Sequence, residues 1–392
     1  MIEATSSRQH FLGVPTDAFL RDYWQRKPLL IRQAFPRIQA PLTPEDLAGI
    51  ACEPGVLARL IQHDRKKDSW KVRTGPFAES LFPKLGKADW TLLVQDMDKW
   101  DGDVRALLAR FDFLPRWRFD DIMVSFAAPG GSVGAHVDQY DVFLLQGQGR
   151  RRWQVDTNPD APREFRDDVE LKLLREFTPT HDWVLEPGDM LYLPPGVPHY
   201  GVAEDACLTF SVGMRAPSHA EVLSAWADEM LEQLPDNLRY RDAGIAAPAD
   251  PGEIDAAAAA RVLAVFRENV PSSEAEAAAF FGRFITAYRN AVDIAPPPKA
   301  PTPAQVAEKL EKGALLSPHP FARWAWHRYG SRAMVHVGGE SFDAPAALAS
   351  RLAAATPLGV ADVRLLDNAG RALLQTLVER GYLVLGPAPR KR

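Results

Sequence analysis

The pattern of hydrophobic and polar positions changes character at Ser218. Between residues 122 and 213, short apolar runs alternate with Gly and Pro, which is typical of β-strands joined by tight turns. After Ser218, apolar residues recur every three to four positions, which is typical of amphipathic helices. A β-rich part is therefore followed by a helical part, and we assign the chain to the α+β class.

About eight strands are predicted in the β-rich part, at residues 122–127, 134–139, 142–146, 150–155, 183–185, 190–193, 199–202 and 207–212. Gly- and Pro-containing turns such as 129–131 and 186–189 separate them. Short strands with this punctuation predict a jelly roll (double-stranded β-helix) of the cupin kind. The interval 157–177 is more polar and charged, so we interpret it as an insertion between two strands.

Fewer elements are predicted before residue 122. The predicted helices begin near residues 13, 43 and 104, and the predicted strands lie at 29–31 and 91–94. The segment 118–121 is interpreted as a turn into the first strand of the jelly roll. These elements belong with the β-rich part.

Three helices are predicted after Ser218. Ser218 and Glu221 form a capping box at the start of the first, the second spans residues 254–268, and Ser273 with Glu276 begins the third. Their apolar stripes need a surface to bury, and an interface with a second copy of the chain would provide one. We therefore expect a homodimer.

The Pro-rich run 295–303 is the clearest domain boundary in the sequence. Beyond it, small predicted helices followed by a terminal β hairpin fit a winged-helix module. The predicted domains are a catalytic jelly roll at 1–217, a helical dimerisation region at 218–294, the linker at 295–303 and a winged-helix-like domain at 304–392.

Composition excludes several classes of protein. The 392 residues are 46 % apolar and 25 % charged with a net charge of −5, as in an ordinary globular protein. Two cysteines exclude a disulfide framework and a cysteine-based zinc site. No secretory signal and no apolar run long enough for a membrane span is present, so we expect a cytoplasmic protein without a membrane partner.

Two histidines and one aspartate are the candidate metal ligands. His136 and Asp138 are two positions apart on a predicted strand, so both side chains leave the same face. His199 follows a Pro-Gly turn into another strand. Two imidazoles and a carboxylate suit a redox-active Fe(II) that keeps open coordination positions. The alternative is a pair of core histidines with ordinary partners.

The remaining histidines fit this site less well. His181 precedes a strand in a polar stretch, and we interpret it as part of a solvated turn. His319, His327 and His336 lie beyond the Pro-rich linker and are interpreted as ordinary surface or core residues.

Arg151 is the candidate anchor for an anionic cosubstrate. On a strand, Arg151 and Trp153 share one face while Arg150 and Arg152 share the other. A guanidinium on the interior face requires an anion, and a planar carboxylate fits its donors best. An iron site beside such an anchor implies 2-oxoglutarate. The alternative is an Arg151 that bonds an internal Asp or Glu.

The sequence HVDQYDVFLLQGQGRRRW, with PGVPH ending at His199 and FSVGMRAP at 210–217, resembles the bacterial JmjC-domain ribosomal oxygenases. These are the 50S ribosomal protein arginine 3-hydroxylases. YWQRKPL at 23–29 and LLVQD at 92–96 add to the resemblance. It implies a JmjC barrel, a helical dimerisation segment and a winged helix, in this order along the chain.

The resemblance also implies roles for individual residues. His136, Asp138 and His199 would hold Fe(II), Arg151 would grip 2-oxoglutarate, and Ser125 would line the cosubstrate pocket. The bend before His136 departs from the family pattern Gly-Gly-Gly-Val-Gly-Pro at Ser132 and Ala135. This departure touches the rim of the pocket and leaves the ligands intact.

The predicted function is an Fe(II)- and 2-oxoglutarate-dependent dioxygenase that hydroxylates an arginine side chain of a large-subunit ribosomal protein. Gln139 and Tyr140 are candidates for the substrate side of the pocket, with barrel packing as the alternative for Tyr140. Two other functions remain open at this point. One is an oxygenase for another protein side chain such as histidine, and the other is a non-catalytic metal-binding cupin that regulates DNA through its winged helix.

Nucleic acid is not an expected partner. Residues 304–392 carry 12 Lys and Arg against 7 Asp and Glu, and only the terminal Arg390-Lys391-Arg392 forms a basic run. This small excess favours a scaffolding or substrate-docking role for the winged helix over direct DNA binding.

Overall fold

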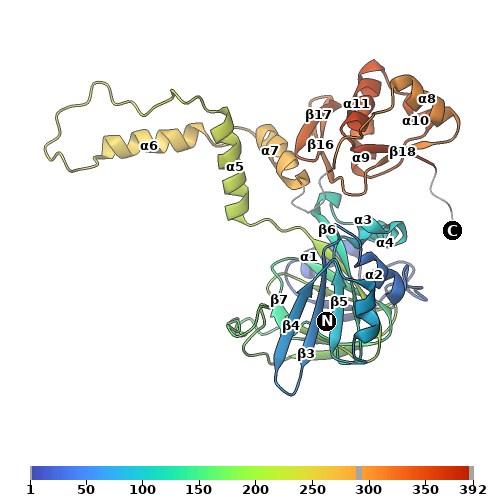
Figure 1. Ribbon diagram of the computed structural model, residues 1–392. Helices are drawn as coiled ribbons and strands as arrows, with labels where there is room; N and C mark the ends of the chain where they lie inside the picture. Colours follow the sequence, from blue (N-terminus) through green and yellow to red (C-terminus); the bar gives the residue numbers. More distant parts are fainter. Residues whose placement is uncertain (1, 288–293, 388–392) are drawn as a thin grey trace. The chain divides into compact units, whose positions relative to one another are not determined.

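The computed structural model describes residues 2–287 and 294–387 of the chain (Figure 1). They form two compact units, with the division in sequence between Ala216 and Pro217. The first unit is β-rich and the second contains the helices and a smaller set of strands. How the second unit divides into a dimerisation region, a linker and a winged helix stays a prediction.

Two sheets build the first unit as a jelly roll. The larger sheet has the strand order β1-β2-β11-β8-β13-β6-β5-β3-β4, and the smaller sheet has the order β10-β9-β12-β7. The strands are β1 (Glu3–Thr5), β2 (Leu29–Arg32), β3 (Ala58–Asp64), β4 (Ser69–Thr74), β5 (Trp90–Val94), β6 (Phe119–Ala127), β7 (His136–Val137), β8 (Val142–Gln148), β9 (Arg151–Val155), β10 (His181–Leu185), β11 (Met190–Leu193), β12 (Pro198–Ala203) and β13 (Cys207–Met214). Every pairing except β1 with β2 is antiparallel.

The central strands β8, β11 and β13 of the larger sheet are buried on both faces over nearly their whole length, which explains their continuous apolar runs. Leu191 and Leu193 of β11 pack in a cluster with Trp153 of the smaller sheet. Met190 and Tyr192 point the other way, into the main core cluster. That second core is completed by the helices before residue 122, which are α1 (Thr16–Asp22), α2 (Pro44–Ile50), α3 (Met97–Trp100) and α4 (Gly102–Ala106).

Three local expectations were wrong in the first unit, and one hairpin was missed. The hairpin of β3 and β4 was not predicted, because β4 alternates exposed and half-buried positions without an apolar run. The predicted strand at 134–139 is limited to His136–Val137. Residues 119–121 begin β6 instead of forming a turn. His181 lies in β10, where it pairs with Val155.

The second unit begins with three capped helices, α5 (His219–Gln233), α6 (Ala256–Glu268) and α7 (Glu274–Thr286). The predicted capping box of Ser218 and Glu221 is present, and Ser273 accepts from the backbone N–H of Glu276. The elements that follow are α8 (Pro303–Glu311), β14 (Leu315–Pro318), β15 (Trp324–Tyr329), β16 (Arg332–Val337), β17 (Glu340–Ala344), α9 (Ala346–Ala353), α10 (Val360–Arg364), α11 (Asn368–Glu379) and β18 (Leu383–Gly386). The last part predicted for the third helix, residues 288–292, lies outside the described residues.

Helix α7 packs on the sheet of β15, β16 and β17. Phe280 and Phe284 of α7 share a buried cluster with Trp226 of α5 and Ala325 of β15. Gly282 lies so close to the sheet that a Cβ there would meet the His336 ring at 2.2 Å. The terminal hairpin predicted for this part was wrong: β18 pairs with the distant β14, and the three-stranded sheet precedes α9.

His336 is buried under α7 and bonded on both ring nitrogens. Its Nε2 lies 2.9 Å from Nδ1 of His327, and its Nδ1 lies 2.9 Å from the Ser341 hydroxyl. Arg283 of α7 approaches the same hydroxyl and forms an ion pair with Glu229 of α5. Burial, with help from the charges of His327 and Arg283, lowers the pKa of His336 to about 4 from its usual 6.5.

The buried His336 predicts that acid weakens the second unit. Between pH 6.5 and 4, His336 takes up a proton in the unfolded chain but stays neutral in the folded chain. The contribution of the neutral His336 to the free energy of unfolding is therefore fully present above pH 6.5 and is lost as the pH falls toward 4. We expect the free energy of unfolding to be about 2 kcal/mol lower at pH 5 than at pH 7.5. Urea-dependent hydrogen exchange of peptides from β15–β17 measures it. In His336→Asn the difference between the two pH values should shrink, and equal differences in both proteins would contradict this account.

Candidate metal centre and cosubstrate pocket

His136, Asp138 and His199 lie together, with one ligand atom from each within 4.8 Å of the others. Strand β12 pairs with β7 so that His199 lies opposite His136, and Asp138 follows β7 directly. Oδ2 of Asp138 is 3.9 Å from Nε2 of His136 and 3.6 Å from Nε2 of His199. Among the residues that the structure describes, this is the one such group of potential metal ligands.

Backbone carbonyls set the tautomer of both histidines. Nδ1 of His136 lies 3.0 Å from the carbonyl oxygen of Gly134, and Nδ1 of His199 lies 2.9 Å from that of Val197. A carbonyl only accepts, so each Nδ1 carries the proton and each Nε2 keeps its lone pair. This outer bonding is typical of histidines that bind metals.

The electrostatics of the site suit a cation. His199 is 2 % exposed. Burial, reinforced by the charge that His136 would carry, lowers the pKa of His199 to about 4, so its imidazole is neutral near pH 7. Two imidazoles and one carboxylate are the donor set of a non-haem Fe(II) site. The residues present therefore fit the metal that the sequence predicted.

The bend before His136 is shaped by Gly134 and Ser132. Gly134 has a φ of +82°, and a Cβ there would lie 2.6 Å from Leu173. The Ser132 hydroxyl donates to the carbonyl of Gly201 at 2.6 Å and accepts from the N–H of Gly134 at 3.0 Å. Ser132, one of the two departures from the family pattern, thus fastens the bend to β12.

A cavity of about 520 Å³ contains the three candidate ligands and Arg151. Arg151 is 3 % exposed and Trp153 is 4 % exposed, which confirms that their shared face is the interior one. Arg152 points outward and pairs with Asp182 and Glu204.

Arg151 lacks a carboxylate partner among the described residues. Its Nη2 donates to the carbonyl of Gly201 at 3.3 Å, and its Nε has no hydrogen-bond partner. Burial lowers the pKa of this guanidinium, and the neighbouring Cys207 thiol opposes the shift. A buried cation with an unused donor needs an anion. The alternative, in which Arg151 pairs with an internal Asp or Glu, is not found among the described residues.

Ser125 lies where the sequence analysis expected it. It is 4 % exposed on β6, lines the cavity and pairs in register with Thr209 of β13. Thr209 also lines the cavity, and its hydroxyl donates to the side chain of Gln146 at 3.1 Å. Thr209 was missed, since a Thr in an apolar strand gives no signal of function.

Carboxylates line another part of the same cavity. Asp120, Asp121 and Glu170 are among its lining residues, and so is Tyr140, one of the two candidates for the substrate side. Burial raises the pKa of Asp121 to about 7, and the Lys99 ammonium opposes this shift. The two aspartates were missed because residues 118–121 were interpreted as a turn. An acidic pair at the start of an inward-facing strand was the available signal.

The other histidines take no part in this site. His181 packs against Trp183 on β10, and His336 is the buried core histidine described above. The insertion between β9 and β10, by contrast, does belong to the site. Its residues 170–173 line the cavity, which the polar composition of the insertion did not indicate.

Comparison with known proteins supports this description. A family model described as "JmjC domain" matches residues 106–222, and one described as "ROXA-like winged helix" matches residues 267–384. The second match includes α7, which packs on the sheet of β15–β17.

Relatives extend the likeness over nearly the whole chain. The ribosomal protein uL16 3-hydroxylase of Escherichia coli is 36 % identical over 93 % of this chain and 96 % of its own. A probable ribosomal oxygenase of Haemophilus influenzae is 43 % identical over 57 % of this chain and 55 % of its own.

Solved structures agree. The E. coli ribosomal oxygenase YcfD in complex with cobalt and 2-oxoglutarate matches with a TM-score of 0.83 at 34 % identity, covering 95 % of this chain and 99 % of that one. A further structure of the same protein contains cobalt and succinic acid. With this overlap in sequence, fold and domain order, the chain belongs to the family of JmjC-domain ribosomal oxygenases.

Proposed function

We propose that this protein is an Fe(II)- and 2-oxoglutarate-dependent oxygenase that hydroxylates an arginine side chain of a large-subunit ribosomal protein. The observation that carries the proposal is the cavity itself. It places a His-Asp-His ligand set beside a buried Arg151 that has no carboxylate partner among the described residues. A metal sensor has no need of a buried cation beside its metal, so this pairing favours an enzyme.

His136, Asp138 and His199 would hold the iron, which supplies the activation of dioxygen when bound. The three ligands come from one small region of the cavity, so other coordination positions are left for the keto acid and for dioxygen. The carbonyls of Gly134 and Val197 keep both imidazoles turned toward the metal. The chain's contribution is thus to orient ligands and reactants inside a largely enclosed cavity.

Arg151 would bind the far carboxylate of 2-oxoglutarate. Its free Nε and the low exposure of its side chain make a charge-assisted bond strong, because little water competes for the donors. The hydroxyl of Ser125 lies in the same cavity and can donate to that carboxylate, while the hydroxyl of Thr209 on the paired strand already donates to Gln146.

The carboxylates of the cavity favour arginine as the substrate side chain. Asp120, Asp121 and Glu170 offer acceptors for a planar cation with several donors. A histidine side chain is mostly neutral near pH 7 and offers these carboxylates fewer donors and no full positive charge. Arginine specificity therefore rests on this acidic part of the cavity, and a ribosomal protein substrate places the reaction in the cytoplasm.

The first test is direct. Iron-loaded protein incubated with 2-oxoglutarate and peptides of ribosomal proteins should add one oxygen to an arginine, detected by mass spectrometry. His136→Ala and Asp138→Ala should abolish the gain, because each removes a ligand. Asp121→Asn should retain metal binding and lose turnover of the arginine peptide. An oxygen gain on histidine alone would move the assignment to the histidine alternative.

Arg151→Ala tests the cosubstrate anchor. Loss of a buried charged hydrogen bond should raise the KM for 2-oxoglutarate by roughly 10- to 100-fold, while iron remains bound. Steady-state kinetics and metal analysis measure the two effects. Arg152→Ala is the matched control, because Arg152 is the neighbouring arginine but faces outward. Equal loss of iron in Arg151→Ala would refute the assigned role.

We also propose that the protein is a homodimer held together through α5 and α6. No residue of α6 is buried in the single chain. Leu263 is 46 % exposed and Phe266 is 67 % exposed, and Leu223 and Leu231 of α5 are exposed as well. A second copy of the same helices would cover this apolar surface in a symmetric interface.

A double substitution tests the interface. Leu263→Glu with Phe266→Glu should convert the dimer to a monomer in light scattering, because two charges would be buried against the partner. Glu268→Gln, on the polar side of the helix end, should leave the dimer intact. Circular dichroism should show unchanged helix content in both. A double variant that still runs as a dimer would contradict the proposal.

None of the helices in the described part of the chain has both the length and the apolar character that crossing a bilayer requires.

A further inference from the structure

The insertion between β9 and β10 folds into a small hairpin beside the cavity. The N–H of Arg166 donates to the carbonyl of Leu173 at 2.8 Å, and the N–H of Arg175 donates to that of Glu164 at 2.8 Å. Phe165 and Leu174 form an isolated antiparallel bridge between these two bonds. The tip of this hairpin, residues 167–172, continues into Leu173, and residues 170–173 line the cavity with the candidate metal ligands. We call residues 164–175 the insertion hairpin.

One side of the insertion hairpin is fastened to the bend that delivers His136. The N–H of Leu174 donates to the carbonyl of Ala135 at 2.8 Å. The buried Leu173 packs against Gly134, where a Cβ would leave no room for it. Backbone hydrogen bonding and apolar packing hold this side, so these contacts remain when a single charged side chain is replaced.

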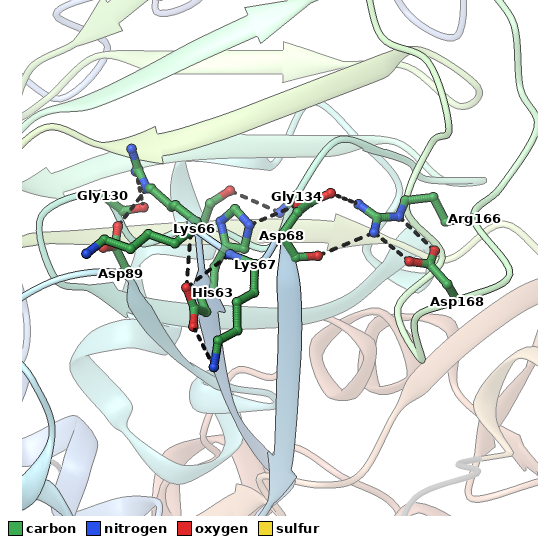
Figure 2. A network of polar contacts seen from close by, with 12 residues as sticks. His63, Lys66, Lys67, Asp68, Asp89, Gly130, Gly134, Arg166 and Asp168 are labelled. Atoms are coloured by element: carbon green, nitrogen blue, oxygen red, sulfur yellow. Dashed lines mark hydrogen bonds and ion pairs between the residues drawn. The ribbon is translucent and has the colours of Figure 1, made fainter.

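Arg166 fastens the other side to a distant part of the sequence. Its Nη1 lies 2.8 Å from Oδ2 of Asp68, which belongs to the turn between β3 and β4. The same guanidinium binds Asp168 of the insertion hairpin at 2.7 Å (Figure 2). Its side chain is 20 % exposed, although Asp68 is 63 % exposed. One arginine therefore joins two loops that are 98 positions apart in the chain.

The turn that carries Asp68 is itself held in place. Arg65 donates to the carbonyl of Gly130 at 2.8 Å and pairs with Asp89 at 2.8 Å. His63 lies 3.2 Å from Asp68 and stacks on Trp70 (Figure 2). The hydrogen bond from His63, followed by that from Arg166, lowers the pKa of Asp68, so the carboxylate stays ionised. Arg166 thus binds a partner with a defined position.

We propose that Arg166 is a positioning residue for the protein substrate: by binding Asp68 it holds residues 170–173 as one wall of the substrate-binding cavity. This inference rests on the proposed function, since it assigns the wall to the same substrate. The wall carries Glu170, one of the carboxylates that favour arginine. Arg166 has no contact with the candidate metal ligands or with Arg151 among its recorded bonds.

The expected size of the effect separates positioning from folding. A partly exposed ion pair contributes little to the stability of a fold, so its loss leaves the jelly roll folded. The same loss is enough to lower the population of the ordered conformation of a loop several-fold. The KM for the arginine peptide should therefore rise, while the free energy of unfolding should stay nearly unchanged.

Arg166→Ala is the test, with Arg175→Ala as the matched control. Arg175 lies in the same hairpin, and among the described residues its side chain forms one ion pair, with Asp167 of that hairpin at 3.6 Å. In Arg166→Ala we expect the KM for the arginine peptide to rise about 3- to 10-fold, with the KM for 2-oxoglutarate unchanged. Arg175→Ala should leave both constants unchanged. A parallel rise in both constants for Arg166→Ala would overturn the assignment, because it would indicate general damage to the cavity.

A double-mutant cycle tests the partner. Asp68→Asn alone should reproduce the rise in KM, and Asp68→Asn combined with Arg166→Ala should be no worse than Arg166→Ala, because both remove one interaction. Additive effects of the two substitutions would show that Arg166 does not act through Asp68.

Hydrogen exchange of the insertion hairpin gives a readout that does not depend on turnover. Peptides from residues 164–175 should exchange faster in Arg166→Ala than in the wild type and in Arg175→Ala, while peptides from β12 stay unchanged. If the wild type hydroxylates no arginine, the proposed function fails, and the exchange data still decide whether Arg166 orders the hairpin. Unchanged exchange in Arg166→Ala would overturn the inference.

Discussion

Strand β12 carries the constraint on which the site depends, because it pairs with β7 on one side and with β9 on the other. The register places His199 opposite His136, and Gly201 opposite Trp153. A slip of one residue would turn His199 to the other face and separate the candidate ligands. Gly201 is needed at its position, since a Cβ there would lie 2.7 Å from Trp153 and 2.8 Å from Nε of Arg151. The metal site and the anion site therefore depend on one register.

Charged residues of both signs line this cavity. Arg151 lies where burial is nearly complete and no carboxylate among the described residues neutralises it. The acidic residues Asp120, Asp121 and Glu170 line the same cavity. Opposite charges in one cavity offer separate places for an anionic cosubstrate and a cationic side chain. This separation is the physical basis for expecting 2-oxoglutarate and arginine to bind together.

Loops that are distant in sequence support the bend before His136 from two sides. Arg65 of the β3–β4 turn binds the carbonyl of Gly130, and Leu174 of the insertion hairpin binds that of Ala135. Arg166 and Asp68 then join the two loops to each other. Ser132, a departure from the family pattern, adds a bond to Gly201. The ligand-bearing segment is thus fixed although β7 itself is only two residues long.

The sequence alone determined the types and the local spacing of the chemical groups. Arg151 and Trp153 point inward together because strand periodicity is two, and His136 and Asp138, also two positions apart, bring their ligand atoms together. The capping box of Ser218 and Glu221, the cap at Ser273 and the jelly-roll punctuation are equally local, and they were confirmed. Only the tertiary structure decided which groups meet. The contacts of Arg166 with Asp68, the place of Asp121 in the cavity and the pairing of β18 with β14 all depend on register and loop closure over long separations. The local periodicity of the sequence does not predict such pairings, because they depend on which arrangement of distant segments buries the most apolar surface in the complete fold.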